Sequence, residues 1–296
     1  MAKEPRSIRG KVVAITGGAR GIGKCTAETL SRRGARVAIG DLDTELAQET
    51  ADGLGGEAIA LELDVTDCES FADFLAQVEE CLGPLDVIVN NAGIMPLGPF
   101  HSESDETAHR MIDINLHGVL YGMKLAMPGM MRRNSGHIVN IASQAGKAGF
   151  PGGATYCATK HAVVGVSEAV RAELRETEIQ VSCVMPAVVN TELASGLTEA
   201  RGVKNVEPED VAEAIAKALE YPKFDVYVPA YAGGIAKVMM LLPRGGREAM
   251  ARALRADKVL WEVDDNKRAA YEDRAAHSEP GLEPERGESS VSSSKP

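Results

Sequence analysis

The 296-residue sequence predicts an α/β fold in which a seven-stranded parallel sheet is covered by helices on both faces. Seven short runs, rich in β-branched residues and apolar at successive positions, indicate strands buried on both faces. Longer segments with helical periodicity separate these runs, for example residues 71–82 and 162–176. Since this alternation continues without an internal repeat over about the first 230 residues, we expect a single sheet domain.

The strands are expected in chain order at the positions of the seven runs. These are residues 11–16, 35–40, 57–63, 85–90, 136–142, 179–184 and 225–229. Because parallel neighbours must be joined by crossover helices, the sheet is predicted to be doubly wound, of the Rossmann type. In such a sheet the ligand crevice lies beyond the carboxyl ends of the strands.

The pattern changes after the seventh run. Residues 8–230 form the sheet domain, and residues 231–276 are expected to be a C-terminal helical extension. Residues 277–296 are mostly Pro, Ser, Glu and Gly, and they offer too little apolar surface to offset their ordering entropy. We therefore expect a disordered tail there.

Composition narrows the class of protein. A net charge of −11 argues against a nucleic-acid or anionic-membrane surface, because neither attracts a negatively charged body. Five scattered cysteines without a CxxC motif indicate neither a disulfide framework nor a metal site. The amino terminus lacks the apolar run of a signal peptide, and residues 235–242 are far shorter than the ~20 residues of a membrane span. We expect a cytoplasmic protein without a transmembrane segment.

A glycine-rich segment, TGGARGIG at 16–23, follows the first strand and precedes a helical segment. Gly17, Gly21 and Gly23 allow a tight turn and a close approach of the backbone to a pyrophosphate at the helix amino terminus. A plain glycine-rich turn is the alternative. The position in the first strand–helix unit favours the phosphate loop.

The second strand is followed by Asp41, 18 residues beyond Gly23, where a dinucleotide fold places the carboxylate that binds the adenosine ribose. A carboxylate there repels the additional phosphate of NADP by about 1–4 kcal/mol per unit charge. Arg20 is an argument for NADP, because a guanidinium in the glycine loop can pair with that phosphate. Asp41 carries more weight because its position is tied to the ribose, and we predict NAD.

Polar residues end the third and fourth strands as well. Asp64 is placed to accept a hydrogen bond from the adenine amino group, although it and Asp67 are equally suited to cap a turn or helix. The segment NNAG at 90–93 follows the fourth strand. Asn91 is suited to hold neighbouring backbone, and Gly93 lets the chain pass close to a cofactor.

Four further polar residues follow: Asn115 inside a helical segment, Ser143 after the fifth strand, and Tyr156 and Lys160 one turn apart at the start of a helix. With TGGARGIG and NNAG, in this order, they resemble the classical short-chain dehydrogenases/reductases over about residues 8–230. The resemblance implies a dinucleotide-binding and catalytic domain with an Asn–Ser–Tyr–Lys tetrad. It also implies cofactor contacts at Ile22, Leu42, Val65, Ala92, Pro186, Val189 and Thr191 and from Tyr156 and Lys160. The family usually has Pro-Gly after the sixth strand, where this chain has Pro186-Ala187.

The roles of the tetrad follow from hydride transfer, in which the proton of an alcohol must pass to a base. The phenol of Tyr156 is protonated at neutral pH, so it serves only if its pKa falls, and Lys160 supplies a positive charge that stabilises the phenolate. Ser143 is expected to hydrogen-bond the substrate oxygen. Lys160 is also expected to hold the nicotinamide ribose, and Asn115 to anchor a water. A solvated lysine, a capping serine and a core tyrosine are the structural alternatives.

Apolar residues dominate the loops expected over the nicotinamide, at 94–100, 144–153 and 188–204. We predict substrate contacts from Met95, Phe150 and Leu193 besides Ser143 and Tyr156, with Ile94, Leu97, Val189 and Leu197 completing the pocket. Such a pocket suits a lipophilic secondary alcohol or ketone, unless these residues only pack beneath the loops. The helices expected at residues 231–260, which include the apolar run Met239–Leu242, are expected to cover the pocket, dimerise or make a peripheral membrane contact.

The leading interpretation is an NAD-dependent oxidoreductase of an alcohol/ketone pair. The alternatives are an NADP-dependent carbonyl reductase and a catalytically silent dinucleotide-binding regulatory protein. The resemblance also implies a homodimer or homotetramer, formed through the helices that hold Asn115 and Tyr156.

Overall fold

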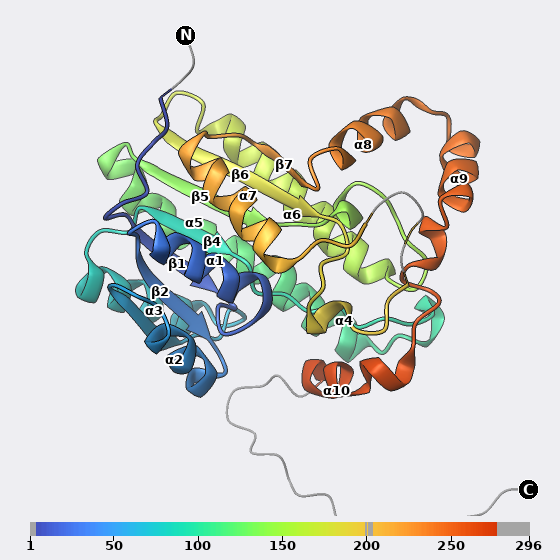
Figure 1. The fold of residues 1–296 in the computed structure, drawn as a ribbon, viewed down its shortest axis with the longest axis horizontal. Helices are drawn as coiled ribbons and strands as arrows, with labels where there is room; N and C mark the ends of the chain where they lie inside the picture. The colour runs from blue at the N-terminus through green and yellow to red at the C-terminus, as the bar shows by residue number, and fades with distance from the viewer. Residues whose placement is uncertain (1–3, 199, 201–203, 277–296) are drawn as a thin grey trace, which may run out of the picture.

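The computed structural model describes residues 4–198, 200 and 204–276, and the tail predicted at 277–296 lies outside the described residues. Seven parallel strands form one sheet in the order β3-β2-β1-β4-β5-β6-β7 (Figure 1). The predicted fold is confirmed. The strands are β1 (Val12–Thr16), β2 (Arg36–Asp41), β3 (Ala58–Glu62), β4 (Val87–Asn90), β5 (Gly136–Ile141), β6 (Ile179–Pro186) and β7 (Asp225–Val228).

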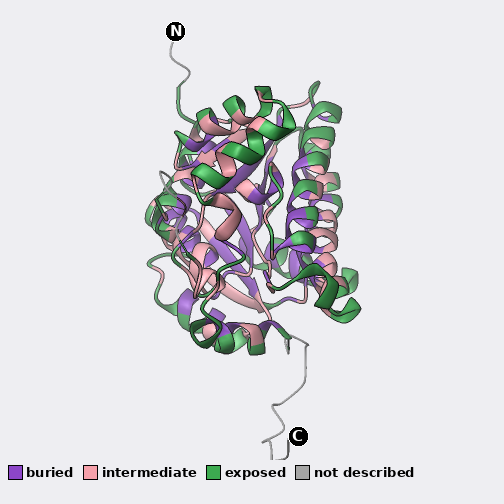
Figure 2. Cartoon of the chain, turned by 90° about the vertical axis from the view of Figure 1, so that its right-hand side faces the viewer, coloured by how far each residue is buried: buried purple, intermediate pink, exposed green. Residues whose placement is uncertain are grey.

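Helices cover both faces of the sheet, and successive residues of β1 show why. Val12 and Ala14 pack with one set of helices, whereas Val13 and Ile15 pack with the other, because side chains alternate along a strand. The first face carries α3 (Cys68–Leu82), α5 (Gly118–Arg133) and α6 (Ala154–Glu173); the second carries α1 (Gly21–Arg32), α2 (Thr44–Asp52) and α7 (Pro208–Glu220). Figure 2 shows the strands buried between helices whose outer sides are exposed.

The strand order reverses between β1 and β4, because β2 and β3 lie on one side of β1 and β4–β7 on the other. At such a reversal the loops after neighbouring strands diverge and leave a crevice for a ligand. A short helix, α4 (Asp105–Ile112), and a π-helical turn, Asp113–His117, follow β4 and lead into α5.

The C-terminal extension leaves the edge of the sheet after β7 and returns to the carboxyl ends of the strands (Figure 1). It contains α8 (Ala232–Leu241), α9 (Arg244–Ala253), a 3₁₀ turn (Ala256–Lys258) and α10 (Asp265–Ala276). Met240 and Leu241 are 64% and 86% exposed, so the apolar end of α8 does not cover the pocket. The later part of the extension does. No helix in the described ranges is long and apolar enough to cross a bilayer.

Candidate active site

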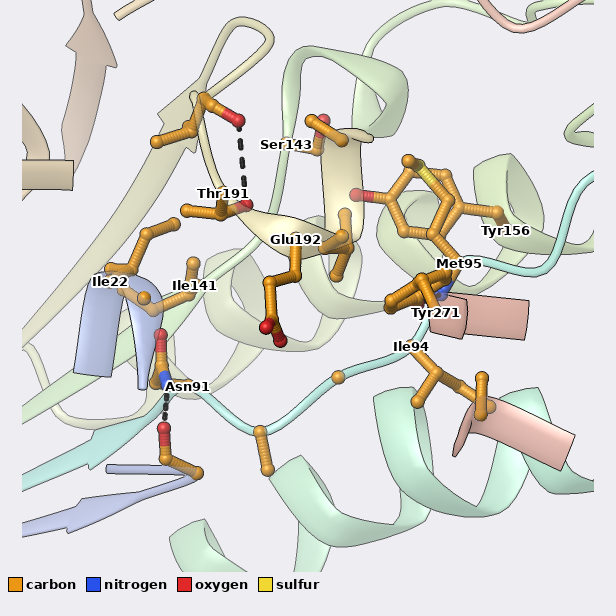
Figure 3. A pocket seen from close by; sticks show the side chains of 18 of the residues that line it. Ile22, Asn91, Ile94, Met95, Ile141, Ser143, Tyr156, Thr191, Glu192 and Tyr271 are labelled. Atoms are coloured by element: carbon orange, nitrogen blue, oxygen red, sulfur yellow. Dashed lines mark hydrogen bonds between the residues drawn. The ribbon is translucent and has the colours of Figure 1, made fainter. Parts of the chain in front are cut away.

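One continuous cavity of ≈ 1650 Å³ runs along the carboxyl ends of the strands, from the glycine loop to α10. Figure 3 shows Ile22 and Asn91 on one side of it and Met95, Tyr156 and Tyr271 on the other. Of the predicted site residues, Gly23, Asn115 and Leu97 do not line this cavity. Within the described parts of the chain, no three His, Cys, Asp or Glu side chains are placed to share a metal ion.

At one end of the cavity the glycine loop leads into α1. Arg20 precedes the helix in an extended conformation without a side-chain cap, and the first turn holds no acidic residue. The first N–H groups of α1 therefore remain available to an anion. Gly17 has φ +63°, and a Cβ there would lie 2.8 Å from Ala92 Cα. A Cβ on Gly23 would lie 2.2 Å from the Gly17 carbonyl oxygen, so this glycine allows the helix to pack on the loop rather than facing the cavity.

The glycine loop is held by the end of β4. The Asn91 side-chain amide donates to the carbonyls of Thr16 and Gly17 at 2.9 Å each. The Thr16 hydroxyl accepts in turn from the backbone N–H groups of Asn91 and Ala92, at 3.0 Å each. The neighbouring backbone is held by Asn91, as the sequence predicts, and this fixes the loop relative to the fourth strand.

Acidic side chains lie beside the glycine loop at the dinucleotide end of the cavity. Asp41 accepts from the backbone N–H of Ala19 at 2.9 Å and of Asp43 at 3.2 Å. Burial raises the pKa of Asp41, while these two hydrogen bonds and the Arg20 charge lower it. Arg20 pairs with Asp43 and lies 3.7 Å from a Glu192 carboxylate oxygen. Its guanidinium is therefore already partnered by carboxylates.

The two aspartates after β3 have different surroundings. Asp64 lies in the cavity wall beside Val65, and one of its oxygens accepts from the backbone N–H and the hydroxyl of Thr66, at 2.8 and 2.7 Å. Asp67 is the N-cap of α3 and accepts from Glu69 N–H at 2.8 Å. The structure thus assigns the helix cap to Asp67 and leaves Asp64 facing the cavity.

The loop after β6 forms another wall, lined by Pro186, Val189 and Thr191. Ala187, where the family usually has glycine, is not among the residues with positive φ, and its N–H donates to the Val228 carbonyl at 2.7 Å. The turn therefore accommodates a Cβ without strain.

Tyr156, Ser143 and Lys160 meet in the middle of the cavity. Burial raises the pKa of Tyr156 to about 12, and its hydrogen bond with the Ser143 side chain opposes that shift. Lys160 Nζ donates to the Ile141 carbonyl at 2.9 Å and lies 5.8 Å from the centroid of the Tyr156 ring. Burial lowers the pKa of Lys160 to about 8. The predicted fall in the phenol pKa is absent here because burial outweighs the Ser143 hydrogen bond and the charge of Arg268.

Burial of Lys160 predicts that Lys160→Met raises the free energy of unfolding at pH 7 by about 2 kcal/mol. The pKa falls from 10.5 to about 8 on folding, a cost of ~3 kcal/mol, and the lost hydrogen bond to Ile141 offsets ~1 kcal/mol. Between these two values the unfolded chain binds more protons, so wild type gains stability as pH rises and the difference shrinks. Urea unfolding at pH 7 and at pH 10 measures this; a variant less stable than wild type at pH 7 contradicts it.

Asn115 lies in the π-helical turn and is fully buried. Its side-chain oxygen accepts from Ile94 N–H at 2.8 Å, and its amide donates to the Ile94 carbonyl at 2.8 Å and to the Thr159 hydroxyl at 3.2 Å. Both amide hydrogens are thus used within the protein, so a water at the Asn115 side chain would have to donate to its oxygen. The geometry gives Asn115 a positioning role for the backbone at residue 94.

The other end of the cavity is apolar. Met95, Phe150 and Leu193 line it as predicted, together with Ile94 and Leu197. Leu97 does not line the cavity but packs against the apolar cluster beneath it. Ala256, Val259 and Leu260 also line the cavity, as one of the alternatives for residues 231–260 had it, whereas the contribution of Tyr271 was not predicted.

A buried arginine fixes the extension to this end of the cavity. Arg268 on α10 is 2% exposed, pairs with Glu272, and donates to the carbonyls of Met95, Leu193 at 2.8 Å and Ser195 at 3.2 Å. The guanidinium lies 4.7 Å from the centroid of the Tyr271 ring. The Tyr271 hydroxyl accepts from Met95 N–H at 2.7 Å. Arg268 and Tyr271 therefore join α10 to both loops of the apolar end.

The fold and the cavity define the class of protein. A family model described as short chain dehydrogenase matches residues 11–202. The chain therefore belongs to the short-chain dehydrogenase/reductase family, a family of oxidoreductases, as the resemblance predicted.

Individual relatives match most of the chain. An uncharacterised oxidoreductase of Listeria innocua is 35% identical over 242 residues, 77% of this chain and 97% of that protein. 17-beta-hydroxysteroid dehydrogenase 13 of mouse is 34% identical over 235 residues, 76% of this chain and 76% of that protein. The crystal structure of a short-chain dehydrogenase/reductase from Burkholderia phymatum in complex with NAD is similar with a TM-score of 0.72 at 26% identity, covering 78% of this chain and 93% of that chain.

Proposed function

We propose that this oxidoreductase interconverts an apolar secondary alcohol and its ketone by hydride transfer with NAD, using Tyr156 as general acid/base. The observation that carries the proposal is the meeting of Tyr156, Ser143 and Lys160 midway between an anion-binding helix end and an apolar pocket. Residues 8–230 would supply the dinucleotide and catalytic groups, and residues 231–276 would close the substrate end.

The cavity fits a dinucleotide. The uncapped start of α1 would hold the pyrophosphate, Asp41 the adenosine ribose, and Asp64 the adenine. When bound, an oxidised nicotinamide dinucleotide supplies a hydride acceptor and a positive charge. The neighbour from Burkholderia phymatum, solved with NAD, supports the choice of a nicotinamide dinucleotide.

Each of the four tetrad side chains has its own role in the proposed reaction. Ser143 holds the substrate oxygen, and the phenolate of Tyr156 takes its proton as the hydride leaves the adjacent carbon. In the reduction direction the neutral phenol returns that proton to the oxygen. Lys160, when charged, stabilises the phenolate through space and also holds the nicotinamide ribose. Asn115 keeps residue 94, and with it the adjacent cavity wall, in place.

The apolar lining sets the substrate class. Met95, Leu193, Val259 and Leu260 belong to or pack on one apolar cluster with Tyr156. An apolar alcohol buries its surface there, whereas a sugar leaves hydroxyls without partners. The hydroxysteroid dehydrogenase among the relatives is consistent with a lipophilic substrate. For the assembly, we propose a homodimer or homotetramer formed through α5 and α6, which sedimentation equilibrium tests.

The carboxylate at the end of β2 predicts the choice between the two dinucleotides. In Asp41→Ala the repulsion of the second phosphate by this carboxylate is lost, while Arg20 keeps its carboxylate partners Asp43 and Glu192. The ratio of kcat/KM with NAD to kcat/KM with NADP is expected to fall by about 10- to 100-fold.

Asp67→Ala is the matched control, because this aspartate caps α3 outside the cavity and should leave the ratio unchanged. If wild type already prefers NADP and Asp41→Ala keeps that preference, the protein is an NADP-dependent reductase instead.

The proposed reaction is tested by incubating the full chain with NAD and matched pairs of apolar secondary alcohols and polyols, and following the absorbance of reduced nicotinamide. Turnover of the apolar members supports the proposal. Binding of NAD in a calorimeter without turnover of any alcohol or ketone would instead support the silent regulatory protein.

A further inference from the structure

The helical pair formed by α8 and α9 stands away from the sheet (Figure 1). At the end of α8, Val238, Met240 and Leu241 are 52%, 64% and 86% exposed; we call these three residues the apolar tip. Val238 and Met240 point to opposite sides of the helix, since two residues turn it by about 200°. The exposed apolar side chains are therefore not confined to one face of the helix, although Met239 between them is half-buried.

Basic side chains flank the apolar tip in the sequence. Lys237 precedes it by one residue, and Arg244, Arg247 and Arg252 follow on α9, all exposed. Glu248 is the one acidic residue between Ala232 and Ala253, and it pairs with Arg244. This segment is positively charged in a chain whose net charge is −11.

We propose that the apolar tip and its basic residues form a docking surface for an anionic lipid bilayer. Exposed apolar side chains enter the acyl boundary, while arginine and lysine bind the phosphate layer outside it. An exposed apolar cluster rimmed by cations of this kind marks an interaction site. The proposal stands on this surface alone and does not depend on the reaction proposed above.

The negative charge of the whole chain does not oppose this docking. At physiological salt, interactions between exposed charges are screened beyond about 8 Å, so a membrane that meets the tip senses the nearby arginines first. The proposal therefore departs from the expectation from net charge at this segment alone.

Charge also favours a bilayer over a second copy of the chain. A two-fold contact through this patch would bring together two surfaces that both carry net positive charge. An anionic bilayer instead supplies opposite charge to the patch.

The surface leads directly to the substrate end of the cavity. The chain passes from α9 into the 3₁₀ turn, whose first residue, Ala256, lines the cavity, followed by Val259 and Leu260. A bilayer held at the tip thus lies one short segment away from the apolar wall.

The test is co-sedimentation of the full chain with phosphatidylcholine vesicles that contain or lack phosphatidylserine. We expect binding to the anionic vesicles, weakened by high salt, and little binding to phosphatidylcholine alone. The double variant Met240→Asp/Leu241→Asp, and separately Arg244→Glu/Arg247→Glu, should each lower the partition coefficient at least about tenfold.

Tyr221→Asp is the matched control, because Tyr221 is 45% exposed at the end of α7, outside both the proposed surface and the helices α5 and α6. It should leave vesicle binding unchanged, and circular dichroism should show that every variant is folded. Equal binding by wild type and both double variants, or no binding by wild type, overturns the proposal. So does a drop in sedimentation coefficient for Met240→Asp/Leu241→Asp without vesicles, since that result identifies an interface between copies.

Discussion

Replacing Tyr156 by phenylalanine is expected to lower kcat/KM for alcohol oxidation by about 10³- to 10⁴-fold, the upper range for loss of a positioned acid/base. The ring remains in its apolar cluster, so the free energy of unfolding should change by less than about 1 kcal/mol. Steady-state kinetics and urea unfolding measure the two effects. Because only the hydroxyl is lost, a large rate effect with an unchanged fold identifies the oxygen as the reacting group.

The pKa of Tyr156 also determines how the rate of alcohol oxidation should change with pH. Burial raises the pKa of Tyr156 to about 12 in the protein alone, so the phenolate is the minor form at neutral pH. For oxidation, log kcat/KM of wild type should therefore rise with pH, with a slope approaching one below the pKa of Tyr156 in the enzyme before the alcohol binds. The residual activity of Tyr156→Phe should lack this slope.

Tyr271→Phe is the matched control, since it removes a hydroxyl from the same cavity that holds Met95 N–H rather than the substrate. It should raise KM more than it lowers kcat. A wild-type rate independent of pH, or full activity in Tyr156→Phe, contradicts the proposed chemistry.

Replacing Arg268 by methionine is expected to lower the free energy of unfolding by about 3 kcal/mol. The change leaves the carbonyls of Met95, Leu193 and Ser195 without their donor in a buried site. Met95 and Leu193 line the apolar end of the cavity. KM for an apolar alcohol should therefore rise at least about tenfold, while kcat changes less. Urea unfolding and kinetics with saturating NAD measure both.

Lys267→Met is the control for Arg268, because this neighbour on the same helix is 74% exposed and pairs only weakly with Asp264. It should have little effect on either quantity. The conservative Arg268→Lys keeps the positive charge but lacks the several N–H donors of the planar guanidinium. Its free energy of unfolding should therefore lie between those of Arg268→Met and wild type. An unchanged KM in a folded Arg268→Met shows that α10 does not shape the substrate end.

The sheet was predictable because its pattern is local. Strands buried on both faces carry runs of apolar residues, so each run marked a strand within a few positions, as at Arg36–Asp41. Most candidate site residues followed, because Gly17, Asp41 and Ser143 come directly after strands, and parallel strands bring their carboxyl ends to one edge.

The extension was less predictable, because its role depends on long-range contacts. Arg268 and Tyr271 lie in a charged helix, and nothing in their neighbourhood indicates that both are buried. Their partners at Met95 and Leu193 are more than 70 residues away. Conversely, the apolar run at Met239–Leu242 suggested a cover for the pocket, yet its end is exposed, because this part of α8 extends beyond the sheet against which it would pack.

The attachment of α10 is uneven, and this determines how it responds to ionic strength. At the substrate end Arg268 is buried, so salt barely screens its hydrogen bonds. Toward the cofactor end, Arg274 meets Glu192 in a pair whose side chains are 44% and 59% exposed, and salt weakens such a pair. Glu192 also lies 3.7 Å from Arg20 in the glycine loop. The attachment of α10 over the substrate end should therefore be insensitive to salt, whereas its attachment beside the dinucleotide groove should weaken as the ionic strength rises.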